Sequence, residues 1–119
     1  MRVLIVDDNE ELRGFLALTL TEAAVDAVCA ANAEDAIHKI ESESFDALVI
    51  DSIMQDSDGI ELVQRIRGVK SGRSVPIIMM STISTALARR MATTAGCNEF
   101  LVKPFGQMQF IEQVKNLAR

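Results

Sequence analysis

Four charged side chains in this 119-residue sequence stand where a short apolar run ends. Three are carboxylates and one is a lysine: Asp7 and Asp8 after residues 3–6, Asp51 after residues 47–50, and Lys103 after residues 100–102. Such runs are typical of buried strands, and the charge after each run marks the start of a loop. Grouped carboxylates bind divalent cations, and a nearby lysine offers a positive charge to a phosphoryl group. If the strands are parallel neighbours, the four side chains form a site for both.

Strands and helices alternate along the chain, and these elements must position the charges. Apolar runs predict strands at residues 3–6, 26–30, 45–50, 76–80 and 100–102. Apolar residues at helical spacing predict a helix after each strand. Asn9 is the expected N-cap of the first helix, the third helix opens at Gly59, and Gly96 ends the fourth. The apolar side of the last helix is expected at Met108, Ile111, Val114 and Leu117.

The strands are continuously apolar, and this pattern indicates burial on both faces. A sheet of that kind is parallel and covered by helices. Five strand–helix units are too few for an eight-unit barrel, so we expect an open, doubly wound α/β sheet. Right-handed crossovers bring the carboxyl ends of all strands to one edge, where ligands of such folds bind. Periodicity alone leaves open which strands are neighbours.

Size and composition indicate one domain, residues 1–119, with a core built almost without aromatic residues. The formal charge of −5 argues against a nucleic-acid-binding surface, which would be basic. No apolar run approaches the roughly 18 residues of a membrane span, and no basic start leads into a signal segment. Cys29 and Cys97 lie far apart in the sequence and outside any metal-binding spacing, so we expect reduced thiols and a cytoplasmic location.

Taken together, the motifs resemble the receiver domain of bacterial response regulators, of the CheY type. The matching motifs are Val6-Asp7-Asp8, Asp51, Ser81 and Lys103-Pro104-Phe105, in order and each at a strand exit. The resemblance covers the chain from Arg2 to the last helix. It implies a flavodoxin-like (βα)5 fold with strand order 2-1-3-4-5, in which the first and third strands are neighbours. It also implies a cis peptide bond before Pro104.

The resemblance assigns a role to each residue of the expected site. Asp51 accepts a phosphoryl group from a phosphohistidine, and Mg²⁺ removes the repulsion between the two anions. Mg²⁺ is bound directly by Asp8, Asp51 and the backbone carbonyl of Ile53, and through a water by Asp7. Ser81 and Lys103 bind the phosphoryl oxygens. Ser81 and Phe100 are the switch residues that carry the change to the surface.

Three positions depart from the usual pattern of this family or bear on the rate of the chemistry. Gln55 stands where a proline is common, so we expect a less rigid loop after Asp51. Thr82 is larger than the usual Ala or Gly and is expected to narrow access to Asp51. Ile53 is apolar and is expected to shield the phosphoryl group from water. Thr82 and Ile53 are therefore candidate rate-tuning residues.

The resemblance implies a phosphorylation-dependent switch rather than an enzyme. The expected partners are a histidine kinase or histidine phosphotransfer protein and a downstream target protein, with no nucleic acid and no membrane bound by this domain. The face of the fourth helix, fifth strand and fifth helix is expected to change shape. A phosphorylation-dependent dimer is a further possibility. The chain is either a complete single-domain regulator or a receiver cut from a longer regulator with an output domain.

Three other functions on a similar fold fit the sequence less well. A Mg²⁺-dependent aspartyl phosphatase needs a second acid two residues after its nucleophile, and only Glu10, after Asp8, fits that spacing. A flavin carrier needs a phosphate-binding loop after the first strand, where two aspartates would repel the ligand. A receiver-like module that never accepts phosphate would tolerate loss of the acids or the lysine, and none is lost.

Single residues also have ordinary structural alternatives. Asp56 and Asp58 are expected to form a turn with Gly59. Ser81, Thr82 and Ser84 are each able to cap the fourth helix.

Overall fold

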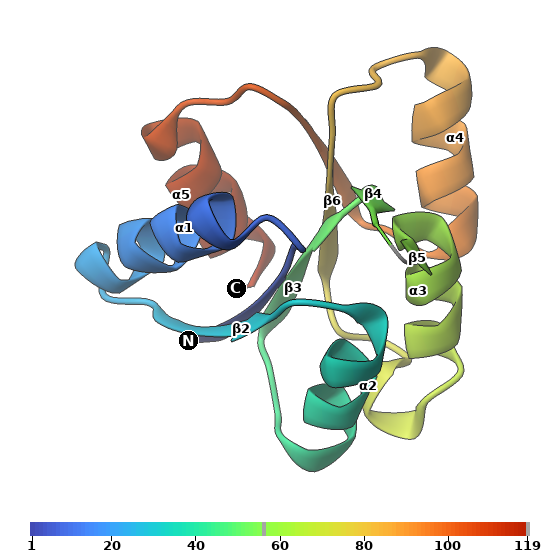
Figure 1. The fold of residues 1–119 in the computed structure, drawn as a ribbon, viewed down its shortest axis with the longest axis horizontal. Helices are drawn as coiled ribbons and strands as arrows, with labels where there is room; N and C mark the ends of the chain where they lie inside the picture. Colours follow the sequence, from blue (N-terminus) through green and yellow to red (C-terminus); the bar gives the residue numbers. More distant parts are fainter. Residues whose placement is uncertain (56, 119) are drawn as a thin grey trace.

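The computed structural model describes residues 1–55 and 57–118, which form one α/β unit. The strands are β1 (Arg2–Val6), β2 (Asp26–Ala30), β3 (Ala47–Asp51), β4 (Ile53–Met54), β5 (Ser57–Asp58), β6 (Ile77–Ser81) and β7 (Glu99–Val102). The helices are α1 (Glu10–Glu22), α2 (Ala33–Ser42), α3 (Gly59–Arg67), α4 (Ala86–Ala95) and α5 (Gln107–Leu117), with a 3-10 turn at Lys70–Gly72. Apart from β4 and β5, which follow β3 directly, strands and helices alternate as the periodicity predicts (Figure 1).

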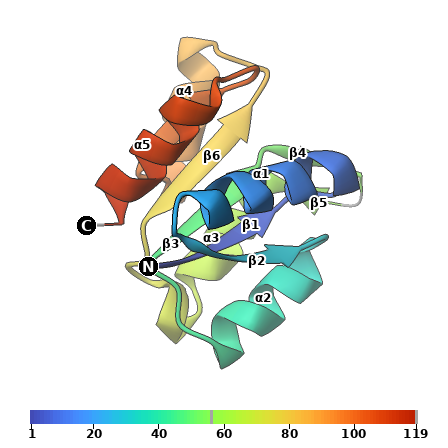
Figure 2. The ribbon, with the colours of Figure 1, turned by 90° about the vertical axis from the view of Figure 1, so that its left-hand side faces the viewer.

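The central sheet has five parallel strands in the order β2-β1-β3-β6-β7. Because β4 and β5 form a separate antiparallel pair, β6 and β7 are the fourth and fifth strands of the sheet. The expected order 2-1-3-4-5 and the expected flavodoxin-like fold are therefore confirmed. The strongly twisted sheet is best followed in Figure 2, where β1, β3 and β6 fan out across the molecule.

Helices cover both faces of the sheet, and each face has its own core. Helices α1 and α5 lie together on one face, and α2, α3 and α4 lie on the other (Figure 1). The first core joins Leu16 and Leu20 of α1 to Phe110 and Val114 of α5. The second is built on aliphatic residues of α2, α3 and α4, among them Ile40, Leu62, Ile66 and Ala92. Burial on both faces explains why the strands are apolar without alternation.

Helix ends agree with most of the capping signals. The Asn9 side chain accepts a hydrogen bond from the N–H of Leu12, and Gly96 ends α4 with a φ of 122°. The cap of α4, however, is Thr85, whose side chain accepts from the N–H of Ala88. The structural alternative in which Ser81, Thr82 or Ser84 caps this helix is therefore wrong, because α4 begins only at Ala86.

The predicted apolar side of the last helix is confirmed at Val114 and Leu117 but is wrong at Met108. Met108 is 67% exposed, whereas Phe110 is fully buried beside Val114. The apolar residues at 108, 110, 111, 114 and 117 allow two stripes, and docking against α1 selects the one that contains the phenylalanine ring.

Between β3 and α3 the sequence signals were weakest. The hairpin of β4 and β5 was not expected, and Asp58 closes it as the N-cap of α3, accepting from the N–H of Ile60. The expected turn at Asp58 and Gly59 is thus a helix start, while Asp56 lies outside the described residues. No helix within residues 1–55 and 57–118 is both long and apolar enough to cross a membrane.

Candidate functional site

Neighbouring strands bring the three aspartates together at the carboxyl edge of the sheet. Strands β1 and β3 pair in register, with Val6 opposite Ile50, so the residues that follow, Asp7 and Asp51, leave the sheet side by side. Asp8 is the next residue along the chain. One carboxylate oxygen from each of these aspartates lies within 4.8 Å of the others. The proximity expected from the resemblance is therefore present.

Asp7 is the most deeply buried member of the cluster, with no exposed surface. Its Oδ1 accepts a hydrogen bond of 2.9 Å from the N–H of Asn9, and its backbone carbonyl accepts one from Arg13. Its Oδ2 is buried and accepts no hydrogen bond from the described residues. Burial raises the pKa of the Asp7 carboxyl, and the nearby charge of Asp51 raises it further. The site thus holds a carboxylate oxygen that lacks a donor.

Lys103 contacts both of the buried acids. Its Nζ donates to Oδ1 of Asp51 over 3.0 Å and lies 3.7 Å from Oδ2 of Asp7, beyond hydrogen-bonding distance. The backbone N–H of Lys103 donates to the carbonyl of Ser81, which links the ends of β6 and β7. The peptide bond between Lys103 and Pro104 is cis, as expected. The ammonium group of Lys103 is therefore held in direct contact with the Asp51 carboxylate.

Asp8 has a partner that the sequence analysis did not find. The backbone N–H of Gln55 donates to Oδ2 of Asp8 over 2.5 Å, which joins the β4–β5 hairpin to the acidic cluster. A proline at this position would have no N–H to donate. The replacement of proline by Gln55 therefore adds a contact to the site, and the expected loss of rigidity in this loop stays a prediction.

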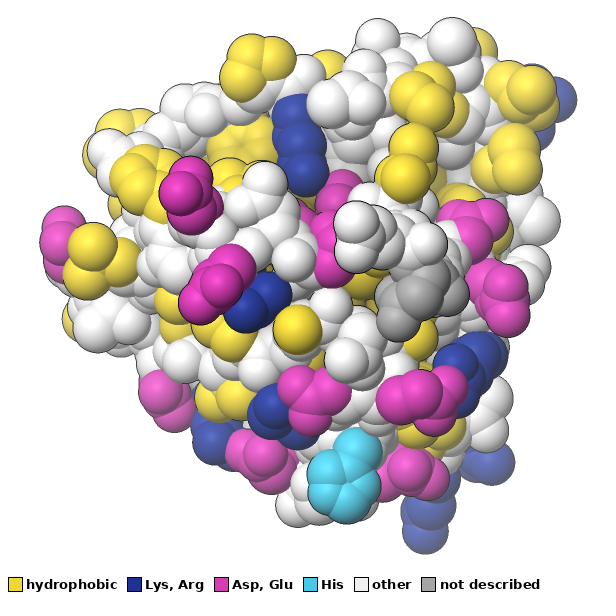
Figure 3. All heavy atoms as spheres, viewed as in Figure 1, with side chains coloured by type: hydrophobic (Ala, Val, Ile, Leu, Met, Phe, Trp, Pro, Cys, Tyr) yellow, Lys and Arg dark blue, Asp and Glu magenta, His cyan; other side chains and the backbone are white. Residues whose placement is uncertain are grey.

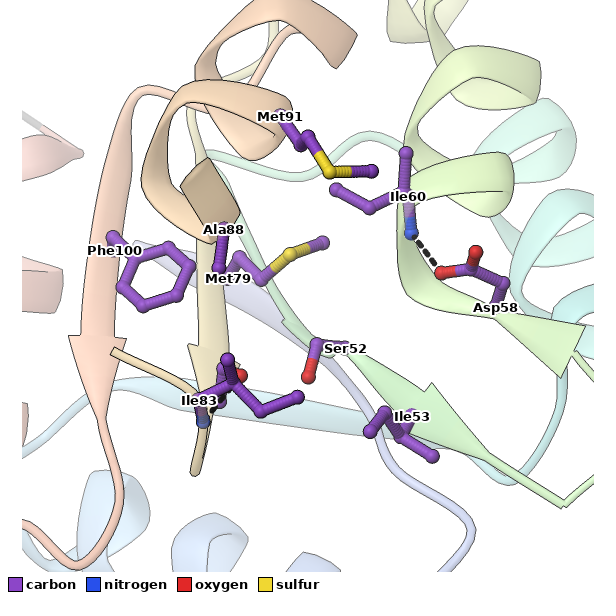
Figure 4. Close-up of a pocket in the computed structure, with 10 residues that line it drawn as sticks. Ser52, Ile53, Asp58, Ile60, Met79, Ile83, Ala88, Met91 and Phe100 are labelled. Carbon is purple, nitrogen blue, oxygen red and sulfur yellow. Dashed lines mark hydrogen bonds between the residues drawn. The ribbon is translucent and has the colours of Figure 1, made fainter. Parts of the chain in front are cut away.

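Ser81 ends β6 beside the cluster and is almost fully buried. Its Oγ accepts a hydrogen bond of 3.0 Å from the N–H of Ile83, so its own proton is free to be donated elsewhere. Ser81 also borders a cavity of about 190 Å³ between β6, α3 and α4 (Figure 4). The cavity is lined mainly by apolar side chains, which include Ile53, Ile60, Met79, Ala88, Met91 and Phe100.

Phe100 lies in β7 on the wall of this cavity and is half-buried. The guanidinium carbon of Arg89, on α4, lies 5.0 Å from the centre of its ring. Sequence reasoning identified Phe100 but missed Arg89. The available signal was weak: an arginine on the exposed side of a helix has no feature that marks it as a partner of an aromatic ring.

The two candidate rate-tuning residues line different hollows, each shared with at least one residue of the site. Ile53 is 61% exposed and borders the cavity beside Ser81. Thr82 is exposed and lines a second hollow together with Lys103, Phe105 and residues of α1. The effects of both residues on rate, and the ligand role of the Ile53 carbonyl, stay predictions.

The cluster fits Mg²⁺ by the chemistry of its donors. Mg²⁺ prefers hard oxygen ligands and keeps several waters, so one or two direct carboxylates are sufficient. Here three carboxylates converge, and the unpaired Oδ2 of Asp7 is suited to accept a hydrogen bond from a metal-bound water. Acidic side chains are visible in a recess of the face seen in Figure 3, between α1 and β4. Residues Asp8, Asp51 and Asp7 would hold such an ion.

Comparison with proteins of known sequence gives a consistent result. The family model for the response regulator receiver domain matches residues 3–115. The chain is 30% identical to the transcriptional regulatory protein TctD of Salmonella typhimurium over its whole length, but it spans only 52% of TctD. It is also 31% identical to an uncharacterized 14.6 kDa protein of Leptolyngbya boryana, with 97% of this chain and 88% of that protein covered.

Solved structures show the same relationship. The chemotaxis protein CheY4 of Vibrio cholerae superposes with a TM-score of 0.94 at 27% identity, covering 98% of this chain and 97% of CheY4. The receiver domain of the sensor histidine kinase PA1611 of Pseudomonas aeruginosa, which has a magnesium ion in its active-site cleft, superposes with a TM-score of 0.89 at 25% identity, covering 98% of this chain and 96% of that chain. From the fold, the clustered acids, the lysine over Asp51 and the family match, this chain belongs to the response regulator receiver domains of two-component signalling.

Proposed function

We propose that this protein is a Mg²⁺-dependent phosphoacceptor that takes a phosphoryl group from a phosphohistidine onto Asp51. The observation that carries the proposal is the placement of Asp51. Its carboxylate lies within 4.8 Å of an oxygen of each of two further aspartates and also accepts a hydrogen bond from the ammonium group of Lys103. A carboxylate that belongs to a cation-binding cluster and also contacts a fixed positive charge is suited to attack the phosphorus of an anionic phosphoryl group.

The roles of the side chains follow from their contacts. When bound, Mg²⁺ would neutralise charge on the phosphoryl oxygens and on the carboxylates that face them. An oxygen of Asp51 attacks the phosphorus as the bond from phosphorus to the histidine nitrogen breaks. Lys103 exchanges its hydrogen bond with Asp51 for one with a phosphoryl oxygen, and Ser81 donates its free hydroxyl proton to another. Asp7 would hold a metal-bound water through its unpaired Oδ2.

Phosphorylation is proposed to shift the population of molecules between two conformations of one surface of the domain. Once the Ser81 hydroxyl turns toward a phosphoryl group, the cavity that it borders widens further, and the inward position of the Phe100 ring becomes the favoured one. The surface formed by α4, β7 and α5 then favours a target protein. A covalent modification of this kind stabilises one of two states that already exist. The protein acts as a switch and is not an enzyme in its own right.

The partners are proposed at the level that the family allows. A histidine kinase or histidine phosphotransfer protein supplies the phosphoryl group, and a target protein or a second copy of this chain receives the signal. Relatives such as TctD are transcriptional regulators about twice as long. The full protein is therefore proposed to be either this domain alone or this domain joined to an output domain. The net charge of −5 supports a role without direct nucleic-acid contact. Both cysteines are free, in keeping with a cytoplasmic location.

The alternative of an aspartyl phosphatase has less support. Its second acid would be Glu10, which is the first residue of α1 and is exposed. An exposed carboxylate in a helical first turn interacts with the helix dipole and is poorly placed to transfer a proton inside the site.

The proposal predicts phosphorylation of one residue. Incubation with acetyl phosphate and Mg²⁺ should add one phosphoryl group to the wild-type protein, as measured by intact-protein mass spectrometry. Asp51→Asn should abolish the added mass. Asp58→Asn is the matched control, because Asp58 is an exposed neighbour whose helix-capping role an asparagine can fill. Labelling of Asp51→Asn at the wild-type level, or its loss in Asp58→Asn alone, would contradict the assignment.

A further inference from the structure

Phe100 lines two hollows of similar size, an inner one on the side of Ser81 and an outer one on the side of Arg89, and both are partly open to solvent. The inner one is the apolar cavity of about 190 Å³ that Ser81, Met79 and Met91 also border (Figure 4). The outer one, of about 200 Å³, is lined mostly by polar side chains and includes Arg89. An aromatic ring that borders two such hollows can occupy two positions, and the surrounding residues determine which position is more populated.

The inner cavity is large enough to receive the ring. An apolar cavity of about 150 Å³ is known to accept a benzene molecule, so about 190 Å³ has room for a phenylalanine ring. The hollow is open on the side of the exposed residues Ile53, Ile83 and Met91, but moving against its apolar walls would still remove part of the ring surface from water, which favours the inward position. Something must therefore oppose this movement in the unphosphorylated protein if the proposed switch is to have a resting state.

Arg89 is the residue placed to oppose it. Its guanidinium lies 5.0 Å from the centre of the Phe100 ring, within the range of a cation–π contact. Within residues 1–55 and 57–118 it pairs with no carboxylate, so the ring is the partner that the structure gives it. Phe100 has no hydroxyl, so no hydrogen bond from the ring itself can hold it at the surface.

We propose that Arg89 is a positioning residue that holds the Phe100 ring toward the outer hollow and so sets the resting population of the switch. This inference rests on the proposed function, since it concerns the same switch residue. An exposed cation–π contact is weak, and its loss would shift the equilibrium about two- to fivefold toward the inward ring. Arg89 would thus tune basal signalling without touching Asp51 or the metal ligands.

The test measures the position of the ring through its neighbours. The protein is labelled at its methionine methyl groups, and the signals of Met79 and Met91, which line the inner cavity, report the ring current of Phe100. Spectra of the free protein and of the protein with beryllofluoride and Mg²⁺, a phosphoryl mimic, define the two ends of the switch. Arg89→Gln should move both signals of the free protein toward the beryllofluoride positions, corresponding to a two- to fivefold larger inward population.

Two comparisons separate ring positioning from a general effect of charge. Arg90→Gln makes the same change at the adjacent exposed residue and should leave both signals in place. In a Phe100→Leu background, Arg89→Gln should have no further effect on them. Unmoved signals in Arg89→Gln, an equal shift in Arg90→Gln, or an effect that persists without the ring would each overturn the proposal.

Failure of the proposed function gives a different result. If beryllofluoride and Mg²⁺ move no methionine signal of the wild-type protein, the phosphoryl switch itself is wrong. The experiment still tests whether Arg89 positions the ring, because the difference in methionine signals between free wild type and free Phe100→Leu measures the ring current directly. Arg89→Gln must change that difference in the free protein for the positioning role to stand.

Discussion

The surroundings of Asp7 disfavour the ionised form of its carboxyl group. It is fully buried beside two other acids, and one of its oxygens has no donor among the described residues. Lys103 compensates only partly, because its ammonium group is 3.7 Å away and is shared with Asp51. An ionised carboxylate without full compensation destabilises a fold. We therefore expect Asp7 to contribute to metal binding rather than to stability.

The cost of this charge can be measured. Asp7→Asn should stabilise the metal-free protein at pH 7 by about 1–3 kcal/mol, the range for an uncompensated buried polar group. Burial raises the folded-state pKa of Asp7 above its ordinary value of 3.8, so wild-type stability falls as pH rises through that folded pKa. The advantage of the asparagine variant should therefore be largest near neutral pH and shrink as pH falls toward 3.8.

Urea denaturation in EDTA at several pH values gives this free energy. Glu41→Gln is a control, since it removes an exposed carboxylate away from the cluster. A variant that is less stable than wild type at pH 7, or an advantage that grows on acidification, would show that the charge of Asp7 is well compensated.

Asp8 tests the metal more directly. A ligand that binds only the folded state stabilises it, by about 1.4 kcal/mol when the ligand is at ten times its dissociation constant. Millimolar Mg²⁺ should therefore raise the melting temperature of the wild-type protein and should not raise that of Asp8→Ala. Asp35→Ala, which removes a half-buried acid on α2, should keep the shift. Equal shifts in all three proteins would mean that the ion binds elsewhere.

At the scale of elements, the start of α3 packs against the end of β3. The N–H of Gly59 donates to the carbonyl of Ser52 over 2.8 Å, which closes the β4–β5 hairpin over the strand that carries Asp51. A Cβ on Gly59 would overlap the backbone carbonyl oxygen of Asp51 and lie 2.8 Å from the Cα of Ser52. This position requires a glycine because two backbone segments touch there.

Gly59→Ala should therefore destabilise the protein by about 1–3 kcal/mol and slow phosphorylation, because the clash moves the backbone of the phosphoacceptor. Gly14→Ala is the matched control: Gly14 lies in α1, and a Cβ there meets nothing within 4 Å. That substitution should stabilise α1 by roughly 1 kcal/mol and leave phosphorylation unchanged. Denaturant titration and the rate of acetyl phosphate labelling provide the two measurements. Normal stability of Gly59→Ala would show that the hairpin can shift freely.

At the scale of the whole molecule, Arg67 connects the end of α3 by hydrogen bonds to the loop before β6 and to the distant loop before β7. Arg67 donates to the carbonyls of Gly72, Val75 and Gly96 and to the side chain of Asn98, over 2.6 to 3.1 Å. These contacts lie around the amino ends of β6 and β7, opposite the edge that carries Asp51. Burial lowers the pKa of Arg67, and its hydrogen bonds satisfy several backbone carbonyls at once.

Arg67→Lys keeps the charge but cannot reproduce the planar set of donors. It should lower the free energy of unfolding by about 2 kcal/mol, because backbone carbonyls lose their donors. Arg65→Lys changes an exposed arginine that pairs with Glu34 and should cost less than about 0.5 kcal/mol. Both variants should accept phosphate normally under native conditions. A phosphorylation defect in Arg67→Lys alone would connect this end of the sheet to the site.

The sequence was sufficient for several features that local interactions decide, although it missed the Thr85 cap of α4 and the β4–β5 hairpin. Strand runs, the Asn9 cap, the start of α3 at Gly59 and the Gly96 terminus depend on residues within a turn of one another, and all are confirmed. The resemblance added the strand order and the composition of the site. Local patterns were misleading for α5, where two apolar stripes are possible and only docking against α1 selects the one with Phe110.

What only the tertiary structure decided are contacts between residues far apart in the sequence. The N–H of Gln55 reaches Asp8 across 47 positions, Lys103 reaches Asp51 across 52, and Arg89 meets Phe100 from a different element. Periodicity and capping place each side chain on its own strand or helix. The path of the backbone between elements, set by sheet register and helix packing, determines which of them touch, and no local pattern encodes that path.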